Sequence, residues 1–332
     1  MKKIAVVGSG GWGTAIAIAA EKKGHEVVLW SAFEAEIARI CADSRENRRY
    51  LPGVKIPERI LLSADKEKLR GADMVILAVP SQAMRAVLRQ IGDTIGKGVV
   101  IVNVAKGFER KTHLRMSQLV NQELGDVKYC VLSGPSHAEE VSRGLPTMLV
   151  AASYYEQVAK QVQEMFMCES LRIYTHDDVV GVELGGALKN VIALVCGVCD
   201  GMGYADNTKA AIITRGVMEM SRLGVRLGGR AETFNGLTGI GDLIVTCTSS
   251  NSRNLRAGRL IGQGVPPQQA IEQIGMAVEG YHTAEAVYEM ALFLNARMPI
   301  FTKAYEVLYE GYAPKQALYD LMLREKKDEF QG

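Results

Sequence analysis

Six residues near the N-terminus have the spacing of a phosphate-binding turn. Residues 8–13 read GSGGWG, directly after an apolar run at residues 4–7 and before a stretch with helical periodicity. In such a turn the first glycine permits a tight bend, the second lets backbone approach a phosphate, and the third lets helix pack on strand. The start of the helix adds N–H groups and a partial positive charge. The pattern predicts a site for the pyrophosphate of NAD or NADP, made by Gly8, Gly10, Gly11, Trp12 and Gly13.

The sequence leaves the choice between NAD and NADP open. An acidic residue at the end of the second strand would bond the ribose 2′-hydroxyl, and an arginine there would accept a 2′-phosphate. Residues 31–33, which follow the second strand, include no acidic residue and no arginine, and Glu34 lies slightly beyond the position expected for the acidic residue. Arg45, Arg48 and Arg49 lie further along the chain. They could bind a 2′-phosphate, but they are equally well explained as charged residues on a solvated surface. We therefore expect relaxed cofactor selectivity.

One lysine, Lys189, lies inside a strongly apolar stretch that is expected to be helical over residues 179–201. An unpaired buried ammonium is costly, so this side chain must snorkel, pair or face a polar cavity. Gly185 lies one turn earlier on the same face, which would let a ligand approach the backbone. A lysine in such surroundings can exchange a proton with a substrate hydroxyl. The position of Lys189 in an apolar helix is explained equally well by a lysine at a domain interface whose ammonium reaches out to water.

Short apolar runs alternate with helical stretches through the first half of the chain. We expect strands at residues 4–7, 26–30, 74–79, 99–104, 130–132 and 148–151, and helices at 13–23, 34–43, 81–91 and 113–124. This alternation implies parallel crossovers, hence an α/β doubly wound sheet. The runs are almost entirely apolar, as strands covered on both faces are.

Strand signals stop near residue 177. Beyond that point helices are expected at residues 179–201, 208–223, 254–263, 267–274 and 283–295. The sequence therefore predicts two domains: a dinucleotide-binding domain over residues 1–176 and an all-α substrate-binding domain over residues 177–332.

The composition argues against several classes of protein. Lys and Arg number 39 and Asp and Glu 37, a net charge of +2, which argues against a nucleic-acid-binding or membrane-binding surface. The six cysteines are scattered, form neither a disulfide framework nor a zinc site, and indicate a reducing compartment. Glycines interrupt the apolar N-terminal run, so we do not expect a signal peptide. We expect a cytoplasmic protein with no stable membrane insertion and no bound metal.

Six short motifs occur in an order that is specific in combination. They are the glycine turn, residues 104–107 (VAKG), residues 133–136 (SGPS), the pair Lys189-Asn190, residues 239–243 (GIGDL) and residues 251–254 (NSRN). In this order, over nearly the whole chain, the sequence resembles bacterial NAD(P)-dependent glycerol-3-phosphate dehydrogenases. The resemblance implies a Rossmann-type domain joined to a helical domain like that of 6-phosphogluconate dehydrogenase, in a homodimer. It also implies reversible reduction of dihydroxyacetone phosphate to sn-glycerol 3-phosphate, which feeds glycerophospholipid synthesis.

The resemblance also implies roles for individual residues. Lys189 would be the catalytic proton donor and acceptor. The substrate would contact Lys106, Gly134, Ser136, Lys189, Asn190, Asp242, Ser252, Arg253 and Asn254. Besides the glycine turn, the cofactor would contact Lys106, Ala138, Arg253, Ala277 and Glu279. The family often has a basic residue where this chain has Ala32, so the resemblance does not favour NADP.

Two other functions fit parts of the pattern. A 3-hydroxyisobutyrate or 6-phosphogluconate-type dehydrogenase shares the domain plan, but typically has an asparagine four residues after the helix lysine. Here that position is Ala193, and the asparagine is adjacent at Asn190. A non-catalytic dinucleotide sensor would need no proton donor, so Lys189 and Asp242 argue against it.

Simpler structural explanations also apply to some of these residues. Asp242 and residues 252–254 have the composition of turn or helix-cap residues. Cys196 and Cys199 have C-x-x-C spacing, but they lie in an apolar helix without a redox-type context. We interpret them as buried structural thiols.

Overall fold

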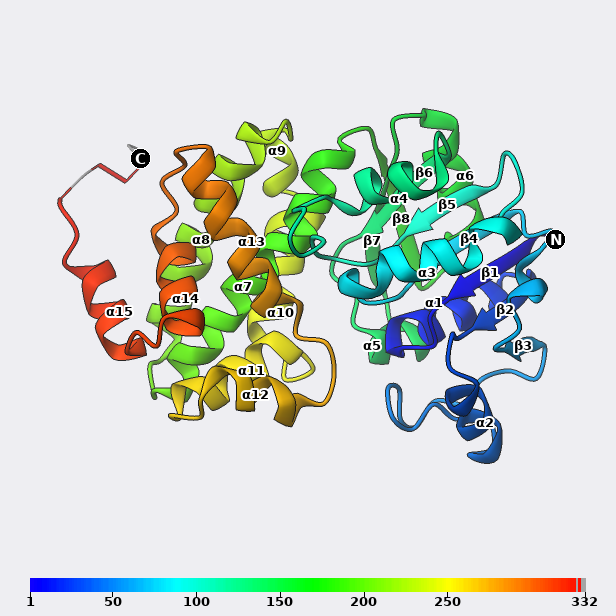
Figure 1. Cartoon of the computed structure of the whole chain (residues 1–332), viewed down its shortest axis with the longest axis horizontal. Helices are drawn as coiled ribbons and strands as arrows, with labels where there is room; N and C mark the ends of the chain where they lie inside the picture. The colour runs from blue at the N-terminus through cyan, green and yellow to red at the C-terminus, as the bar shows by residue number, and fades with distance from the viewer. Residues whose placement is uncertain (327, 330–332) are drawn as a thin grey trace. The chain divides into compact units, whose positions relative to one another are not determined.

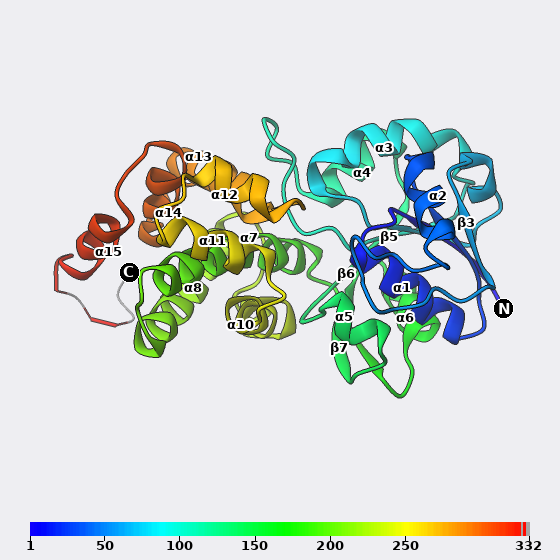
Figure 2. The same ribbon diagram turned by 90° about the horizontal axis from the view of Figure 1, so that it is seen from below.

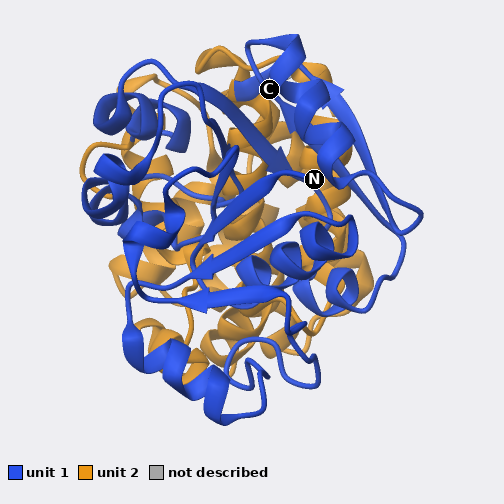
Figure 3. Cartoon of the chain, turned by 90° about the vertical axis from the view of Figure 1, so that its right-hand side faces the viewer, with its two compact units in different colours: residues 1–109, 114–179 blue, residues 110–113, 180–332 orange. Residues whose placement is uncertain are grey.

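The computed structural model describes residues 1–326 and 328–329 and divides into two compact units. Unit 1 consists of Met1–Glu109 and Leu114–Val179, and unit 2 consists of Arg110–His113 and Val180–Gly332 (Figure 3). All the strands of the described sheet belong to unit 1, and the described part of unit 2 is helical. The predicted succession of an α/β region and a helical region is therefore confirmed.

Unit 1 is built on an eight-stranded sheet in the order β3-β2-β1-β4-β5-β6-β7-β8 (Figure 1). Adjacent strands are parallel except β6 and β7, which are antiparallel. The strand order reverses between β1 and β4, and ligands of open α/β sheets bind at the carboxyl ends of strands at such a point. The strands are β1 (Lys3–Val7), β2 (Glu26–Trp30), β3 (Ile60–Ser63), β4 (Met74–Leu77), β5 (Val100–Asn103), β6 (Lys128–Ser133), β7 (Thr147–Ala152) and β8 (Leu171–His176).

Helices cover the sheet and bury its central strands. All of β4 and β5, and all of β1 except its first residue, are buried, which explains why these strands read as continuous apolar runs. The helices of unit 1 are α1 (Gly11–Lys22), α2 (Glu34–Ala42), α3 (Met84–Ile91), α4 (Met116–Leu124), α5 (Ala138–Ser142) and α6 (Glu156–Phe166).

Two strands of the sheet were missed by the sequence analysis. They are β3 and β8, the two edges of the sheet. In β8, Leu171 and Ile173 are buried whereas Arg172 and Tyr174 are exposed, so the strand carries no apolar run. An edge strand with one buried face has this mixed pattern because only alternate side chains reach the core.

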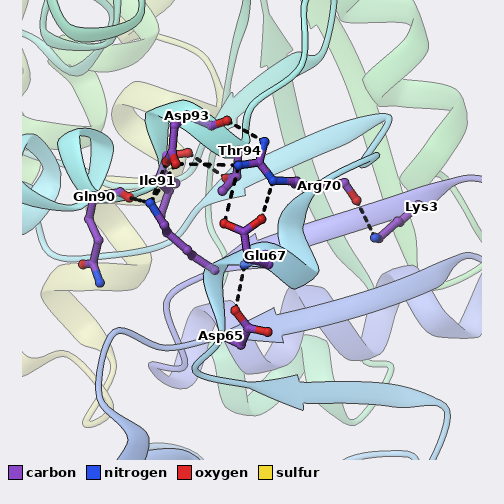
Figure 4. Close-up of polar contacts among 9 residues, drawn as sticks. Lys3, Asp65, Glu67, Arg70, Gln90, Ile91, Asp93 and Thr94 are labelled. Atoms are coloured by element: carbon purple, nitrogen blue, oxygen red, sulfur yellow. Dashed lines mark hydrogen bonds and ion pairs between the residues drawn. The ribbon is translucent and has the colours of Figure 1, made fainter.

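A cluster of charged side chains ties the segment before β4 to the end of α3 (Figure 4). Arg70 pairs with Glu67 and donates to the carbonyl of Asp93 at 2.8 Å, and Lys66 pairs with the Asp93 carboxylate at 2.8 Å. Lys3, at the start of β1, donates to the Arg70 carbonyl at 2.7 Å. The cluster thus lies at the amino end of β1, opposite the glycine turn. Because these groups are largely exposed, water and salt screen the pairs, and the pairs add little to stability.

Unit 2 is organised around α7 (Val179–Gly201), which lies among the other helices (Figures 1 and 2). This helix is long and apolar enough to cross a membrane, but 89% of its most apolar window is buried, as in a core helix. The other elements are α8 (Asp206–Arg226), α9 (Ala231–Phe234), the π-helical turn η4 (Leu237–Gly241), α10 (Asp242–Thr248), α11 (Arg253–Gly262), α12 (Pro267–Ile274), α13 (Glu279–Phe293), α14 (Pro299–Tyr309) and α15 (Pro314–Met322).

Four glycines bring the backbones of α7 and α11 into direct contact. They are Gly197 and Gly201 on α7, and Gly258 and Gly262 on α11. A Cβ atom at any of them would lie 2.1–2.2 Å from a carbonyl oxygen of the facing helix, which no real contact allows. This crossing packs α11 along the C-terminal part of α7.

Candidate active site

The glycine turn has the geometry that a dinucleotide requires. Gly8 has a φ of 116°, and a Cβ there would lie 2.6 Å from the carbonyl oxygen of Ala78. A Cβ at Gly13 would lie 2.0 Å from the Gly8 oxygen, so the third glycine allows α1 to pack on the turn. A Cβ at Gly10 would meet nothing within 4 Å. The second glycine therefore faces open space, where a phosphate could approach the backbone.

The N-terminus of α1 is suited to an anion. The helix begins at Gly11 and has no acidic residue in its first turn. Its N–H groups and its dipole therefore favour negative charge at this end. Trp12 packs against the apolar core of unit 1. Ala138 is close by, because a Cβ at Gly11 would lie 3.7 Å from the Cβ of Ala138.

Two loops at the carboxyl ends of β5 and β6 meet at the carbonyl of Gly134. Lys106 Nζ donates to this oxygen at 3.0 Å, and Ser136 Oγ donates to it at 2.9 Å. Asn103, fully buried at the end of β5, bonds both the amide and the carbonyl of Ala105 and so shapes the Lys106 loop. The sequence analysis missed Asn103. A lone asparagine closing an apolar strand was the available signal.

In unit 2 the Lys189 ammonium is buried and paired. It donates to the Asp242 carboxylate and to the Thr246 hydroxyl, the latter at 2.7 Å. The exposed fractions of these three residues are 6%, 1% and 5%. The sequence left open whether the Lys189 ammonium is paired or reaches out to water, and in the structure it is paired. Thr246 was missed, although its position four residues after Asp242 places both on one face of α10.

Glycines also determine where Asp242 lies. A Cβ at Gly185 would lie 2.5 Å from the carbonyl oxygen of Thr238, so the π-helical turn η4 packs directly on α7. The sequence analysis had Gly185 make room for a ligand, whereas it makes room for this turn. A Cβ at Gly239 would lie 2.0 Å from the Phe234 oxygen, which keeps the turn compact. Asp242 follows as the first residue of α10, beside Lys189.

A chain of amide contacts joins three helices next to this ion pair. Asn254 Nδ2 donates to Asn190 Oδ1 at 3.0 Å, and the Gly280 amide donates to Asn254 Oδ1 at 2.9 Å. Asn190 and Asn254 are both buried. Glu279, the first residue of α13, and the nearby Ala277 are therefore held close to the start of α11.

The start of α11 combines a helix cap with a basic side chain. Ser252 Oγ accepts the Leu255 amide at 3.2 Å, which makes Ser252 the N-cap. Its hydroxyl proton remains to be donated to an anion. Arg253 is the first residue of the helix and is exposed. The sequence analysis gave a helix cap as the simpler explanation of residues 252–254, and this cap is present. A helix cap is compatible with an anion site.

The predicted site residues thus form local groups within each unit. In unit 1 these are the glycine turn with Ala138, and Lys106 with Gly134 and Ser136. In unit 2 they are Lys189 with Asp242, Asn190 with Asn254, Ser252 with Arg253, and Ala277 with Glu279.

Comparisons with known proteins agree along the chain. Residues 3–159 match the family model for the N-terminus of NAD-dependent glycerol-3-phosphate dehydrogenase, and residues 178–319 match that for its C-terminus. A Clostridium perfringens glycerol-3-phosphate dehydrogenase (NAD(P)+) is 51% identical over 99% of both chains. One from Syntrophomonas wolfei is 48% identical, covering 100% of this chain and 97% of the relative. The crystal structure of Coxiella burnetii glycerol-3-phosphate dehydrogenase has a TM-score of 0.93 at 38% identity, covering 97% and 99% of the two chains.

Proposed function

The chain belongs to the NAD-dependent glycerol-3-phosphate dehydrogenase family, and we propose that it catalyses reversible reduction of dihydroxyacetone phosphate by NAD(P)H to sn-glycerol 3-phosphate. The family match supports this activity over both halves of the chain. The observation that carries the proposal is the Lys189 ammonium, which is buried in an apolar helix and held by Asp242 and Thr246. A proton donor fixed in this way is what reduction of a ketone requires.

Lys189 is the catalytic acid and base of the proposed reaction. The carbonyl carbon of the substrate would receive its hydride from NAD(P)H bound at the glycine turn. The carbonyl oxygen then needs one proton, which the Lys189 ammonium gives; in the reverse direction the Lys189 amine takes the alcohol proton. Asp242 and Thr246 hold Nζ in one position through both states. General acid–base catalysis of this kind contributes about a hundredfold to ten-thousandfold in rate.

The substrate phosphate is assigned to the start of α11. Ser252 and Arg253 supply a hydroxyl donor and a guanidinium there, and the helix end supplies N–H groups. Asn254 already uses both ends of its amide, on Asn190 and Gly280. Its proposed part is to position Asn190 for the substrate hydroxyl. Lys106, Gly134, Ser136 and Asp242 complete the proposed substrate set.

The proposed cofactor site rests on the glycine turn. Gly8, Gly10, Gly11 and Gly13 form a cradle that side chains would fill, at the start of a helix without acidic residues in its first turn. These features fit the pyrophosphate of NAD or NADP. The further cofactor contacts that we propose are Trp12, Lys106, Ala138, Arg253, Ala277 and Glu279.

We also propose that the protein works in the cytoplasm as a homodimer and that its product supplies glycerophospholipid synthesis. These points follow from the resemblance to the bacterial enzymes. Leu292 and Phe293 are 65% and 89% exposed at the end of α13, and this apolar surface supports association. Light scattering on the purified protein tests the dimer, because a monomer at all concentrations would contradict it.

Loss of NADH absorbance on addition of dihydroxyacetone phosphate tests the activity. Oxidation of NADH with this substrate, and none with unphosphorylated dihydroxyacetone, is the expected result. In the reverse direction, reduction of NAD+ with 3-hydroxyisobutyrate or 6-phosphogluconate, but not with glycerol 3-phosphate, would assign the other dehydrogenase activity. Binding of NADH without turnover of any of these substrates would indicate a sensor.

A further inference from the structure

A carboxylate lies at the carboxyl end of β2, where the sequence analysis found no acidic residue. Glu36, in the first turn of α2, accepts hydrogen bonds from the hydroxyls of Ser9 and Ser31, both at 2.8 Å. Ser9 belongs to the glycine turn, and Ser31 directly follows β2. Both serines are 3% exposed. The carboxylate is therefore held beside the pyrophosphate turn by two buried donors.

Glu36 keeps hydrogen-bonding capacity for a ligand. Both serines donate to Oε2, whereas the one described residue that donates to Oε1 is Tyr50, through its hydroxyl at a longer 3.3 Å. A carboxylate accepts about four hydrogen bonds, so Oε1 can take another hydroxyl. Glu36, Ser9, Asn47 and Tyr50 line one pocket on unit 1. Asn47 connects the wall of this pocket to the glycine turn, since its Nδ2 donates to the Ser9 carbonyl at 2.6 Å.

The place of Glu36 determines which cofactor group it would meet. In an open parallel sheet with this turn, the adenosine ribose of the dinucleotide lies at the end of the second strand. We propose that Glu36 binds the ribose 2′-hydroxyl and makes the protein prefer NADH to NADPH, in place of the relaxed selectivity expected from the residues at the strand end. This inference rests on the dinucleotide site of the proposed function. Glu34, the acid that the sequence offered, is exposed and does not line the pocket.

Two of the arginines near Glu36, Arg45 and Arg48, are held by other groups of the protein. Arg45 donates to the backbone carbonyl of Pro57 at 2.9 Å and to that of Ile60, and it does not line the pocket. Arg48 lines it, but pairs with Asp43 at 3.3 Å and with Glu46 at 3.5 Å.

Two further arginines, Arg39 and Arg49, also line the pocket. The guanidinium of Arg49 lies over the ring of Tyr50, 5.0 Å from its centre. A 2′-phosphate placed beside the Glu36 carboxylate would face a like charge. Like charges brought together in this way are unfavourable.

The test measures binding of three probes to the full-length protein by calorimetry: ADP-ribose, its 2′-phosphate and its 2′-deoxy form. None carries nicotinamide, so the readout does not depend on turnover. For the parent protein, ADP-ribose should bind about tenfold or more tighter than the 2′-phosphate. It should also bind about tenfold tighter than the 2′-deoxy form, because a hydrogen bond to a charged group is lost. Glu36→Gln should reduce the ratio of the affinity for ADP-ribose to the affinity for its 2′-phosphate.

Glu34→Gln is the matched control. It removes the same charge from the same helix turn but outside the pocket, and it should leave both ratios unchanged. The proposal is wrong if the parent binds the 2′-phosphate as tightly as ADP-ribose, or if Glu36→Gln weakens all three probes equally, which would make Glu36 a support of the turn. Failure of the parent to bind ADP-ribose at all would instead contradict the dinucleotide site itself.

Discussion

The Lys189 ammonium and the Asp242 carboxylate form an ion pair that is almost completely removed from water, with side-chain exposures of 7% and 1%. Desolvation of two charges costs several kcal/mol per ion, so a buried pair of this kind adds little to stability by itself. The added hydrogen bond from Lys189 to Thr246 keeps the ammonium satisfied. Such a pair is better explained by a requirement for a fixed proton donor than by a requirement for stability.

Lys189→Met should abolish turnover while sparing cofactor binding. Methionine keeps the apolar stem but carries no proton, so kcat should fall by about a hundredfold or more. NADH affinity, measured by fluorescence, should stay near the parent value. Near-parental turnover would remove Lys189 from its assigned role.

The same variant leaves the Asp242 carboxylate buried without its cation, which should lower the melting temperature. The double variant Lys189→Met/Asp242→Asn separates the two effects, because it removes the orphan charge as well. Its melting temperature should recover, whereas its kcat should not. Recovery of activity in the double variant would show that Lys189 acts only on stability.

Thr246→Val should lower kcat more than it changes KM. Thr246 donates to the Asp242 carbonyl at 2.6 Å and accepts from Lys189, so valine removes a contact that positions the ammonium. We expect a loss of about tenfold in kcat. Thr248→Val is the matched control, because Thr248 makes the same kind of bond to the Ile244 carbonyl at 2.8 Å on the exposed side of α10. Equal effects of the two changes would contradict a role for Thr246 at Lys189.

The cysteines of α7 should be catalytically inert. Cys196 and Cys199 are buried, and burial raises the pKa of Cys199 to about 12. Contact with Cys247, together with burial, raises the pKa of Cys196 well above its usual range. Since the thiolate is the reactive form, neither thiol is activated. Changing both to alanine should leave kcat near the parent value and lower the melting temperature modestly. Activity that follows the oxidation state of the parent would contradict this.

The sequence predicted elements best where burial is complete. The helices at residues 179–201 and 267–274 have the bounds predicted for them, because apolar periodicity runs through both, Gly201 and Gly275 mark their ends, and Pro267 marks the start of the second. The edge strands β3 and β8 were missed, since a strand with one neighbour has only half its residues in the core. The sequence carries the core pattern more clearly than it carries the edges of the sheet.

At the candidate site, side chains that act through tertiary contacts were hardest to predict. Glu36 reaches the end of β2 from the following helix, so a search at the strand end itself missed it. Asn103 and Thr246 each touch a predicted residue or its loop, but neither belongs to a motif. The glycine turn was predictable because its chemistry depends on the backbone, and the spacing of glycines predicts the backbone conformation.

Arg253→Ala should reveal whether this residue binds the substrate phosphate. A well-made guanidinium–phosphate contact contributes about 1.5–3 kcal/mol. Its loss should lower kcat/KM for dihydroxyacetone phosphate by roughly tenfold to a hundredfold. Unphosphorylated dihydroxyacetone is the control substrate, and it should lose little further. Equal proportional losses for both substrates, with normal cofactor affinity, would show that Arg253 does not read the phosphate.

A buried carboxylate far from these residues in sequence should make stability depend on pH. Glu219, on α8, is 4% exposed and accepts the amides of Ile300 and Phe301 at the start of α14. Burial is the main cause that raises its pKa to about 7, from an ordinary value of 4.5, despite these hydrogen bonds. The folded state therefore holds the proton more tightly than the unfolded state. The stability contributed by protonated Glu219 is complete below pH 4.5 and is lost as pH rises to about 7.

The unfolding free energy of the parent should thus fall by up to about 3 kcal/mol between pH 4.5 and pH 7 because of this one group, and remain level above it. Glu219→Gln has no proton to lose, so its unfolding free energy should change less over that range. Urea unfolding of both proteins at several pH values measures the difference. Glu232→Gln, at an exposed position on α9, controls for loss of one charge and should follow the parent. If Glu219→Gln also follows the parent, the Glu219 carboxylate titrates at the same pH in the folded and unfolded states.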